Sequence, residues 1–149
     1  MVCEYAHCMG NSLGNLKEHV DLFDVYPNLL GGFIWDFVDQ AIEKQDRHGH
    51  PIYLYGGDFD EEKTNGPFCA NGLIAADRTL HPAISEVKKV YANLAIKKDE
   101  DKLIIHNKNV FVTTDEYRFI LRRFVDGKLD SETELIVPTI PPLRQASVK

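Results

Sequence analysis

The chain has 149 residues and a formal net charge of −6, from 17 basic and 23 acidic residues. Its hydrophobic fraction of 44% and charged fraction of 27% are typical of a soluble globular protein with one domain of ordinary size or two small ones. The acidic balance, without a basic stripe of interleaved aromatic residues, argues against binding to nucleic acid or to anionic membranes.

Cysteine usage and the amino-terminal sequence bear on the compartment. Cys3, Cys8 and Cys69 show no paired Cys-x-x-Cys spacing, which argues against a disulfide framework and favours a reducing compartment. Glu4 stands where a signal peptide would have a basic start, and no apolar run approaches the length of a membrane span. We therefore expect a cytoplasmic chain, or a piece of a larger cytoplasmic protein.

The first part of the chain, residues 1–94, predicts alternating strands and helices. MVCEY is the first expected strand, and Asn11 or Ser12 can cap a helix that runs to about Tyr26. The apolar run GGFIWDFV predicts a second strand. The order strand, helix, strand indicates a right-handed parallel crossover.

Two further elements are expected before residue 95. Residues 41–57 predict a hairpin with a polar tip at Arg47, His48 and Gly49. A loop rich in Asp, Glu, Gly and Pro follows. Residues 81–94 then predict a helix with Pro82 in its first turn.

From about residue 95 the spacing of the apolar residues changes from a helical to a strand pattern. KLIIH, NVFVTT and EYRFILRRFV alternate or run apolar over strand lengths. Asp126-Gly127 favours a two-residue hairpin turn before KLDSETELIV. Residues 95–149 therefore predict an antiparallel β region with about four strands, fewer than the seven or so of a complete sandwich.

Glu4 is a charged residue within an apolar strand. A buried, unpaired carboxylate would cost several kcal/mol. At the carboxyl end of a parallel strand, however, α/β barrels place their catalytic groups, so Glu4 could be a nucleophile, a general base or a metal ligand. The alternative is a buried ion pair, for which Arg78 is a candidate partner.

Other candidate residues follow the expected parallel strands. Trp35 precedes Asp36, with Asp39 nearby, and an aromatic ring beside carboxylates suits a sugar, although a single tryptophan is usually a core residue. A long loop carries further polar residues, and such loops are often functional. We expect one concave face to gather the residues that follow these strands: Glu4, His7, Trp35 and Asn71.

Three weaker patterns indicate no site. Cys3, His7 and Cys8 have the wrong spacing for structural zinc. The stretch from Gly10 to Gly14 lacks the lysine of a phosphate-binding loop and the dinucleotide pattern. The histidines at the hairpin tip, His48 and His50, fit solvated positions.

Four segments together resemble a known family: CEYAHCMGNSLGN, GGFIWDFVDQ, YGGDF and FCANGLIAADRTLHPA. In this order and spacing they are similar to the β-galactosidases of glycoside hydrolase family two. The resemblance is strong over residues 1–94 and weak over residues 95–149. It implies an α/β fold, with residues 1–94 as the seventh and eighth strand–helix units of a TIM (β/α)₈ barrel and residues 95–149 as part of the β-sandwich domain that follows.

The resemblance also implies roles for single residues. Glu4 matches the catalytic nucleophile, which forms a covalent galactosyl-enzyme intermediate. His7 matches a residue that contacts the sugar hydroxyls, and Trp35 matches a tryptophan of the galactose pocket. Asn71 matches a residue that touches sugar and a sodium ion, and the backbone carbonyl at Phe68 matches a second sodium ligand.

The resemblance further implies that essential groups lie elsewhere. A retaining glycosidase needs a second carboxyl group about 5–5.5 Å from the first. The family's acid/base glutamate and its magnesium ligands lie on earlier barrel strands, and neither Asp36 nor Asp39 matches the acid/base position. We therefore expect this chain alone to be inactive and to need the rest of the barrel or a complementing fragment. Apolar side chains left uncovered should make it oligomeric or poorly soluble: Val2, Phe33, Ile34 and Phe37.

Two alternatives remain open at this level. The chain could belong to another family-two glycosidase, such as a β-glucuronidase. It could also be a non-catalytic sugar-binding or assembly module in which Glu4 only accepts hydrogen bonds.

Overall fold

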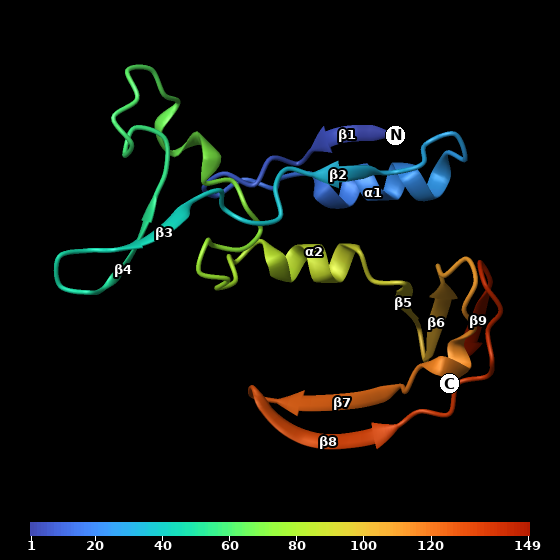
Figure 1. Ribbon diagram of the computed structural model, residues 1–149. Coiled ribbons are helices and arrows are strands. Elements are labelled where there is room, and N and C mark those ends of the chain that lie inside the picture. The colour runs from blue at the N-terminus through green and yellow to red at the C-terminus, as the bar shows by residue number, and fades with distance from the viewer. The chain divides into compact units, whose positions relative to one another are not determined.

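The computed structural model describes residues 1–149 and shows two compact units, Met1–Tyr91 and Ala92–Lys149 (Figure 1). The boundary lies near residue 95, where the apolar period of the sequence changes. Neither helix has the length and apolar character needed to cross a lipid bilayer.

The first unit is organised around a parallel pair of strands. Strand β1 (Val2–Tyr5) pairs in parallel with β2 (Gly32–Ile34), and helix α1 (Leu16–Val25) lies between them in the chain. The predicted strand–helix–strand crossover is therefore confirmed. The two strands approach closely at Gly32, where a Cβ atom would lie 3.0 Å from the carbonyl oxygen of Val2.

Helix α1 begins later than the sequence predicted. Asn11 and Ser12 lie in a turn, and the residue before the helix is Asn15, in the left-handed conformation with φ 63°. The Ser12 hydroxyl donates a hydrogen bond to the carbonyl oxygen of His7, so it is not available as a helix cap. The expected cap at Asn11 or Ser12 is wrong for this reason.

The first unit also contains the predicted hairpin and the predicted second helix, which is shorter than expected. Strands β3 (Ile42–Gln45) and β4 (Pro51–Leu54) form the expected antiparallel hairpin. A 3₁₀ turn, η1 (Gly66–Cys69), precedes helix α2 (Ile84–Val90). The predicted helix over 81–94 is shorter in the structure because Leu94 already pairs with Asn107 in a strand.

A small apolar core holds the first unit together. It lies where α1 and α2 contact each other, and the side chains of Tyr5, Phe23 and Ile34 pack against it. Burial of apolar surface of this kind is the main stabilising contribution to such a unit. Its buried members come from both helices and from two loops: Cys8, Leu13, Leu16, Val20, Leu73 and Val87.

The second unit is antiparallel throughout, as predicted. Strands β5 (Leu94–Asp99), β6 (Lys102–Asn107) and β9 (Gln145–Val148) form one sheet, and β7 (Ile120–Val125) pairs with β8 (Lys128–Glu134). The predicted turn between β7 and β8 is also confirmed. Asp126 and Gly127 there have φ values of 48° and 77°, which the preferred hairpin turn requires.

The predicted strand NVFVTT is absent. The segment bends and enters a 3₁₀ turn, η2 (Thr114–Glu116). The fully buried side chain of Asn107 holds it in this path by donating from Nδ2 to the carbonyl oxygens of Val112 and Ile140, at 2.8 and 3.0 Å. These bonds tie the segment to the end of β6 and to Ile140.

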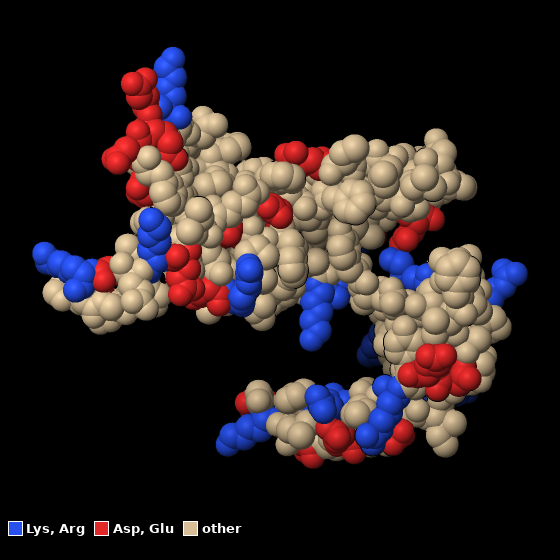
Figure 2. Space-filling model, in the orientation of Figure 1, with Lys and Arg blue, Asp and Glu red and all other residues tan.

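Part of the apolar surface of the first unit is exposed, as expected. Phe33 and Phe37 are 61% and 63% exposed, Val2 is 42% exposed and Ile34 is half-buried. Figure 2 shows few charged side chains over β1 and β2, whereas the β3–β4 side of this unit carries many. The parallel pair therefore presents an uncovered apolar face.

Candidate functional site

One cleft in the first unit gathers the residues singled out from the sequence. It has a volume of about 620 Å³. Glu4, His7, Trp35 and Asn71 thus lie around one concave surface, as expected, and Phe68 lies there as well. The lining includes all five of these residues: Glu4, His7, Trp35, Phe68 and Asn71.

Glu4 lies on strand β1 and its side chain is exposed. Because the carboxylate borders the cleft and is not buried, it pays little desolvation cost. Arg78 is also exposed and makes no ion pair with Glu4. The alternative of a buried ion pair is therefore wrong.

Trp35 follows strand β2 and reaches the cleft. Trp35 is 39% exposed, so it is not a core aromatic residue. Its backbone is held from two sides: its N–H donates to the carbonyl oxygen of Tyr5, and its carbonyl accepts from Cys8. These bonds fix the aromatic ring at the carboxyl ends of the two parallel strands.

Asp36 is engaged in local contacts. Its carboxylate accepts hydrogen bonds from the backbone N–H of Phe37 and from Nε2 of Gln40. The peptide bond between Trp35 and Asp36 is cis. Asp36 thus holds its own turn together and does not line the cleft.

Asn71 is the buried polar residue of the cleft, with 2% of its surface exposed. Its Nδ2 donates to the carbonyl oxygen of Phe68 at 2.8 Å and lies 3.5 Å from Nε2 of His7. The Oδ1 atom is buried and has no hydrogen-bond partner. Such an unpaired oxygen is costly unless something binds it.

The unpaired oxygen of Asn71 suits a hard cation, which prefers oxygen ligands. The Phe68 carbonyl oxygen accepts a hydrogen bond from Nδ2 of the same carboxamide, so a sodium ion held by both residues would need the carboxamide turned to bring Oδ1 beside that oxygen. No group of three or more His, Cys, Asp or Glu side chains could hold a metal ion.

Sequence reasoning missed several residues of the cleft. They come from the loop after β4, which the sequence marked only as long and polar, and from the turn after β2. Glu61 stabilises this loop by accepting from the N–H groups of Gly57 and Phe59, at 3.1 and 3.0 Å. Hydrogen bonds from backbone N–H groups, first that of Glu61 itself, lower the pKa of this carboxyl group. The additional residues include Gln40, Glu61, Lys63, Thr64 and Asn65.

The chain is similar to several curated β-galactosidases. It is 45% identical over 116 residues to the β-galactosidase of Halalkalibacterium halodurans, covering 78% of this chain and 11% of the relative. It is 49% identical over 126 residues to β-galactosidase BgaC of Bifidobacterium adolescentis, covering 85% and 12%. It is 44% identical over 139 residues to the β-galactosidase of Lactobacillus delbrueckii subsp. bulgaricus, covering 93% and 13%.

These alignments cover most of this chain but a small part of each relative. The chain spans between 11% and 16% of the length of the curated relatives it matches. Residues 1–96 match the family model described as glycosyl hydrolases family 2, TIM barrel domain. Since that match covers more than half of the chain, the chain belongs to glycosyl hydrolase family 2, and residues 1–96 are part of its TIM barrel domain.

Proposed function

We propose that this chain supplies the nucleophile of a retaining β-galactosidase. Residues 1–94 would form the seventh and eighth strand–helix units of the barrel, and residues 95–149 the start of the following β-sandwich domain. The observation that carries the proposal is the cleft that joins Glu4 to His7, Trp35 and Asn71. The relatives named β-galactosidase, at 44% to 49% identity, favour a galactoside over a glucuronide as the substrate.

In this proposal the Glu4 carboxylate attacks the anomeric carbon of a bound galactoside. The glycosidic bond breaks, and the leaving oxygen takes a proton from a general acid that another barrel segment provides. The resulting galactosyl ester of Glu4 is then hydrolysed by water, which releases galactose and restores the carboxylate. The Glu4 side chain makes no hydrogen bond or ion pair in the structure, so the carboxylate is available for this attack.

The neighbouring side chains would bind and orient the sugar. The exposed Trp35 ring offers a surface for the apolar C–H face of galactose. His7 and Asn71 line the same cleft, and their side chains can donate hydrogen bonds to the sugar hydroxyl groups or accept them. Holding the sugar in one orientation brings its anomeric carbon within reach of Glu4 and lowers the barrier to attack.

The same proposal includes the family's two metal ions. A sodium ion would be held by the Phe68 carbonyl oxygen and by Oδ1 of Asn71, and would supply a positive charge that attracts a sugar hydroxyl oxygen. The magnesium ligands, like the general acid, would come from other segments of the barrel. The exposed apolar residues Val2, Phe33 and Phe37 would then be covered by neighbouring strands.

The proposal is tested by complementation. The chain is mixed with a fragment that carries the first six barrel units and the acid/base glutamate, and galactoside hydrolysis is assayed. We expect activity in the mixture and none in either part alone. A stable monomer of this chain that hydrolyses galactosides by itself would contradict the proposal.

The role of Glu4 is tested in the active mixture. Glu4→Gln keeps the shape of the side chain but removes the nucleophile, so turnover should fall by a factor on the order of 10⁴ or more. Glu18→Gln, on an exposed position of α1 outside the cleft, is the matched control and should be fully active. A Glu4→Gln enzyme that keeps more than a few per cent of the activity would show that Glu4 is not the nucleophile. A binding module would give no activity with either form.

A further inference from the structure

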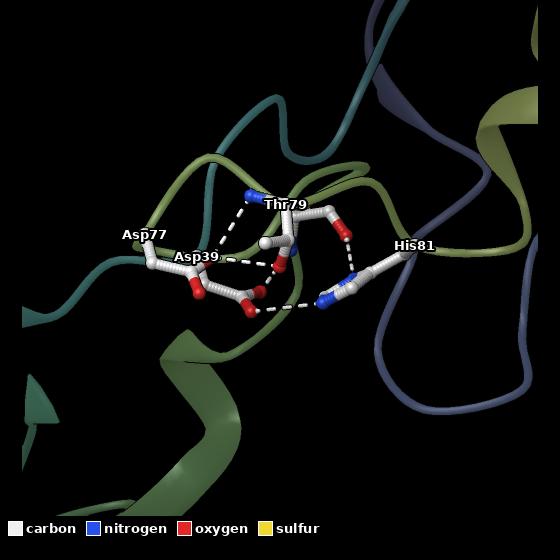
Figure 3. A network of polar contacts seen from close by, with 5 residues as sticks. Asp39, Asp77, Thr79 and His81 are labelled. Atoms are coloured by element: carbon white, nitrogen blue, oxygen red, sulfur yellow. Dashed lines mark hydrogen bonds and ion pairs between the residues drawn. The ribbon is translucent and has the colours of Figure 1, made fainter.

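Two side chains outside the cleft, those of Asp39 and His81, bind both backbone polar groups of Gly72. The N–H of Gly72 donates to Oδ1 of Asp39 at 2.7 Å, and the Gly72 carbonyl oxygen accepts from Nδ1 of His81 at 3.0 Å. The two side chains also contact each other: Oδ2 of Asp39 lies 3.4 Å from Nε2 of His81. In Figure 3 the Asp39 carboxylate and the His81 ring point toward each other.

The position of Gly72 explains why side chains make these bonds. Gly72 is buried, so both of its polar groups need partners. The backbone groups of its surroundings are already used: the N–H of Asp36 donates to the Asn71 carbonyl oxygen, and the N–H of Leu73 donates to the Asp36 carbonyl oxygen. The remaining N–H and C=O of Gly72 therefore depend on Asp39 and His81.

The first of these bonds acts on Asn71. The Asn71 carbonyl and the Gly72 N–H belong to the same planar peptide unit. This unit is held at both ends, by the N–H of Asp36 at 2.8 Å and by Oδ1 of Asp39 at 2.7 Å. Fixing the plane after Asn71 restricts the backbone rotation that decides where the Asn71 carboxamide lies.

We propose that Asp39 and His81 are positioning residues, which aim the Asn71 carboxamide into the sugar-binding cleft. This inference rests on the proposed function, because Asn71 is assigned there to the sugar and to sodium. Neither Asp39 nor His81 lines the cleft, and the side chains of both reach this segment at Gly72. Neither Glu4 nor strand β1 forms a hydrogen bond or ion pair with the side chains of Asp39 and His81. These two residues should therefore affect substrate binding more than they affect the attack by Glu4.

The first test separates KM from kcat in the complemented enzyme. Hydrogen bonds to charged groups contribute enough for Asp39→Ala to raise KM for a galactoside by roughly ten- to a hundredfold. We expect kcat to change much less. Asp39→Asn should recover most of the loss, because a carboxamide oxygen can still accept from Gly72. His81→Ala should raise KM in the same direction.

The matched control is Asp46→Ala. Asp46 also accepts backbone N–H groups, from His48 and His50 at 2.7 and 2.9 Å, but at the tip of the β3–β4 hairpin. It should leave KM unchanged. An Asp39→Ala enzyme whose KM stays within about twofold of the native value, or one that loses only kcat, would overturn the proposal.

The second test needs no activity. Amide hydrogen exchange is followed in the 149-residue chain over the segment 68–74, which includes Asn71 and Gly72. We expect Asp39→Ala to speed exchange there by roughly ten- to a hundredfold, and Asp46→Ala to leave it unchanged. Unchanged exchange in Asp39→Ala would refute the proposed hold on Gly72.

The two tests separate this inference from the proposed function. If the native mixture is inactive, the proposed function fails, while the exchange experiment still decides whether Asp39 orders this segment. If exchange speeds up but KM stays native, Asp39 only stabilises the fold, and its positioning role is refuted.

Discussion

Gly72→Ala is the substitution for which the structure predicts the largest cost. A Cβ atom at Gly72 would lie 2.2 Å from the backbone nitrogen of Asp39, 2.4 Å from the carbonyl carbon of Val38 and 2.6 Å from the carbonyl oxygen of Ile74. All three are backbone atoms, so no side-chain rotation can relieve the overlap. The segment around Gly72 would have to move away from the turn after β2.

This movement costs hydrogen bonds as well as packing. It would stretch the bond from Gly72 to Asp39, at 2.7 Å, and those that join Ile74 to the backbone of Phe37 and Asp39, at 3.1 and 2.9 Å. Overpacking costs about 1–3 kcal/mol and each of the three weakened bonds about 1 kcal/mol, so we expect a loss of about 4–6 kcal/mol. Such a loss is a large part of the stability of a typical domain, about 5–15 kcal/mol.

The assay is chemical unfolding of the chain, with Gly14→Ala as the control. A Cβ at Gly14 meets nothing within 4 Å, and its φ is not in the left-handed region. We expect Gly14→Ala to be unchanged or slightly stabilised, because alanine restricts the unfolded chain. A Gly72→Ala protein within about 1 kcal/mol of the Gly14→Ala protein would refute the steric argument.

Two further predictions concern buried groups. Burial raises the pKa of the Cys8 thiol from 9.0 to about 11, so the folded state holds this proton more tightly than the unfolded state. The stability that this contributes is present below pH 9 and is lost as the pH rises through 11. The free energy of unfolding, measured across this range, should fall by an amount on the order of 2 kcal/mol, and Cys8→Ala should reduce this fall. An equal dependence of unfolding free energy on pH in the native and Cys8→Ala proteins would contradict the prediction. In the second unit, Asn107→Ala leaves the Val112 carbonyl and the Asn109 N–H without the Asn107 side chain as partner, while the Ile140 carbonyl keeps only its bond from the Thr114 N–H. This should cost roughly 2–3 kcal/mol. The exposed Asn93→Ala is its control, and equal unfolding midpoints for the two variants would show that the Asn107 bonds contribute nothing.

The sequence predicted the gathering of the cleft residues because it depends on a simple rule. Parallel strands end at the same edge, so residues that follow β1 and β2 must lie close to each other. Glu4 and Trp35 could be placed in this way. Asn71 is different: it precedes Ile74, which forms a parallel bridge with Val38, and it reaches the cleft from the loop before that bridge.

The errors arose where a side-chain contact, and not the apolar pattern, decides the local structure. Ser12 was expected to cap a helix, but its hydroxyl donates to the His7 carbonyl. The apolar run NVFVTT was expected to be a strand, but the Asn107 side chain holds its backbone in another path. No local pattern at either position reveals the partner, because the contact exists only once the chain is folded.

The carboxylates near the cleft differ in whether they are already engaged, and this difference bears on the catalytic assignment. Asp36 accepts from Phe37 and Gln40, Asp39 accepts from Gly72, and Glu61 accepts from two backbone N–H groups of its own loop. At Glu61, the one of these three that lines the cleft, the backbone hydrogen bonds lower the pKa of the carboxyl group, which makes it a poor proton donor. Glu4 alone lines the cleft without such a bond. In the proposed function Glu4 is the attacking carboxylate, and this difference among the carboxylates is consistent with a general acid that comes from another segment of the barrel.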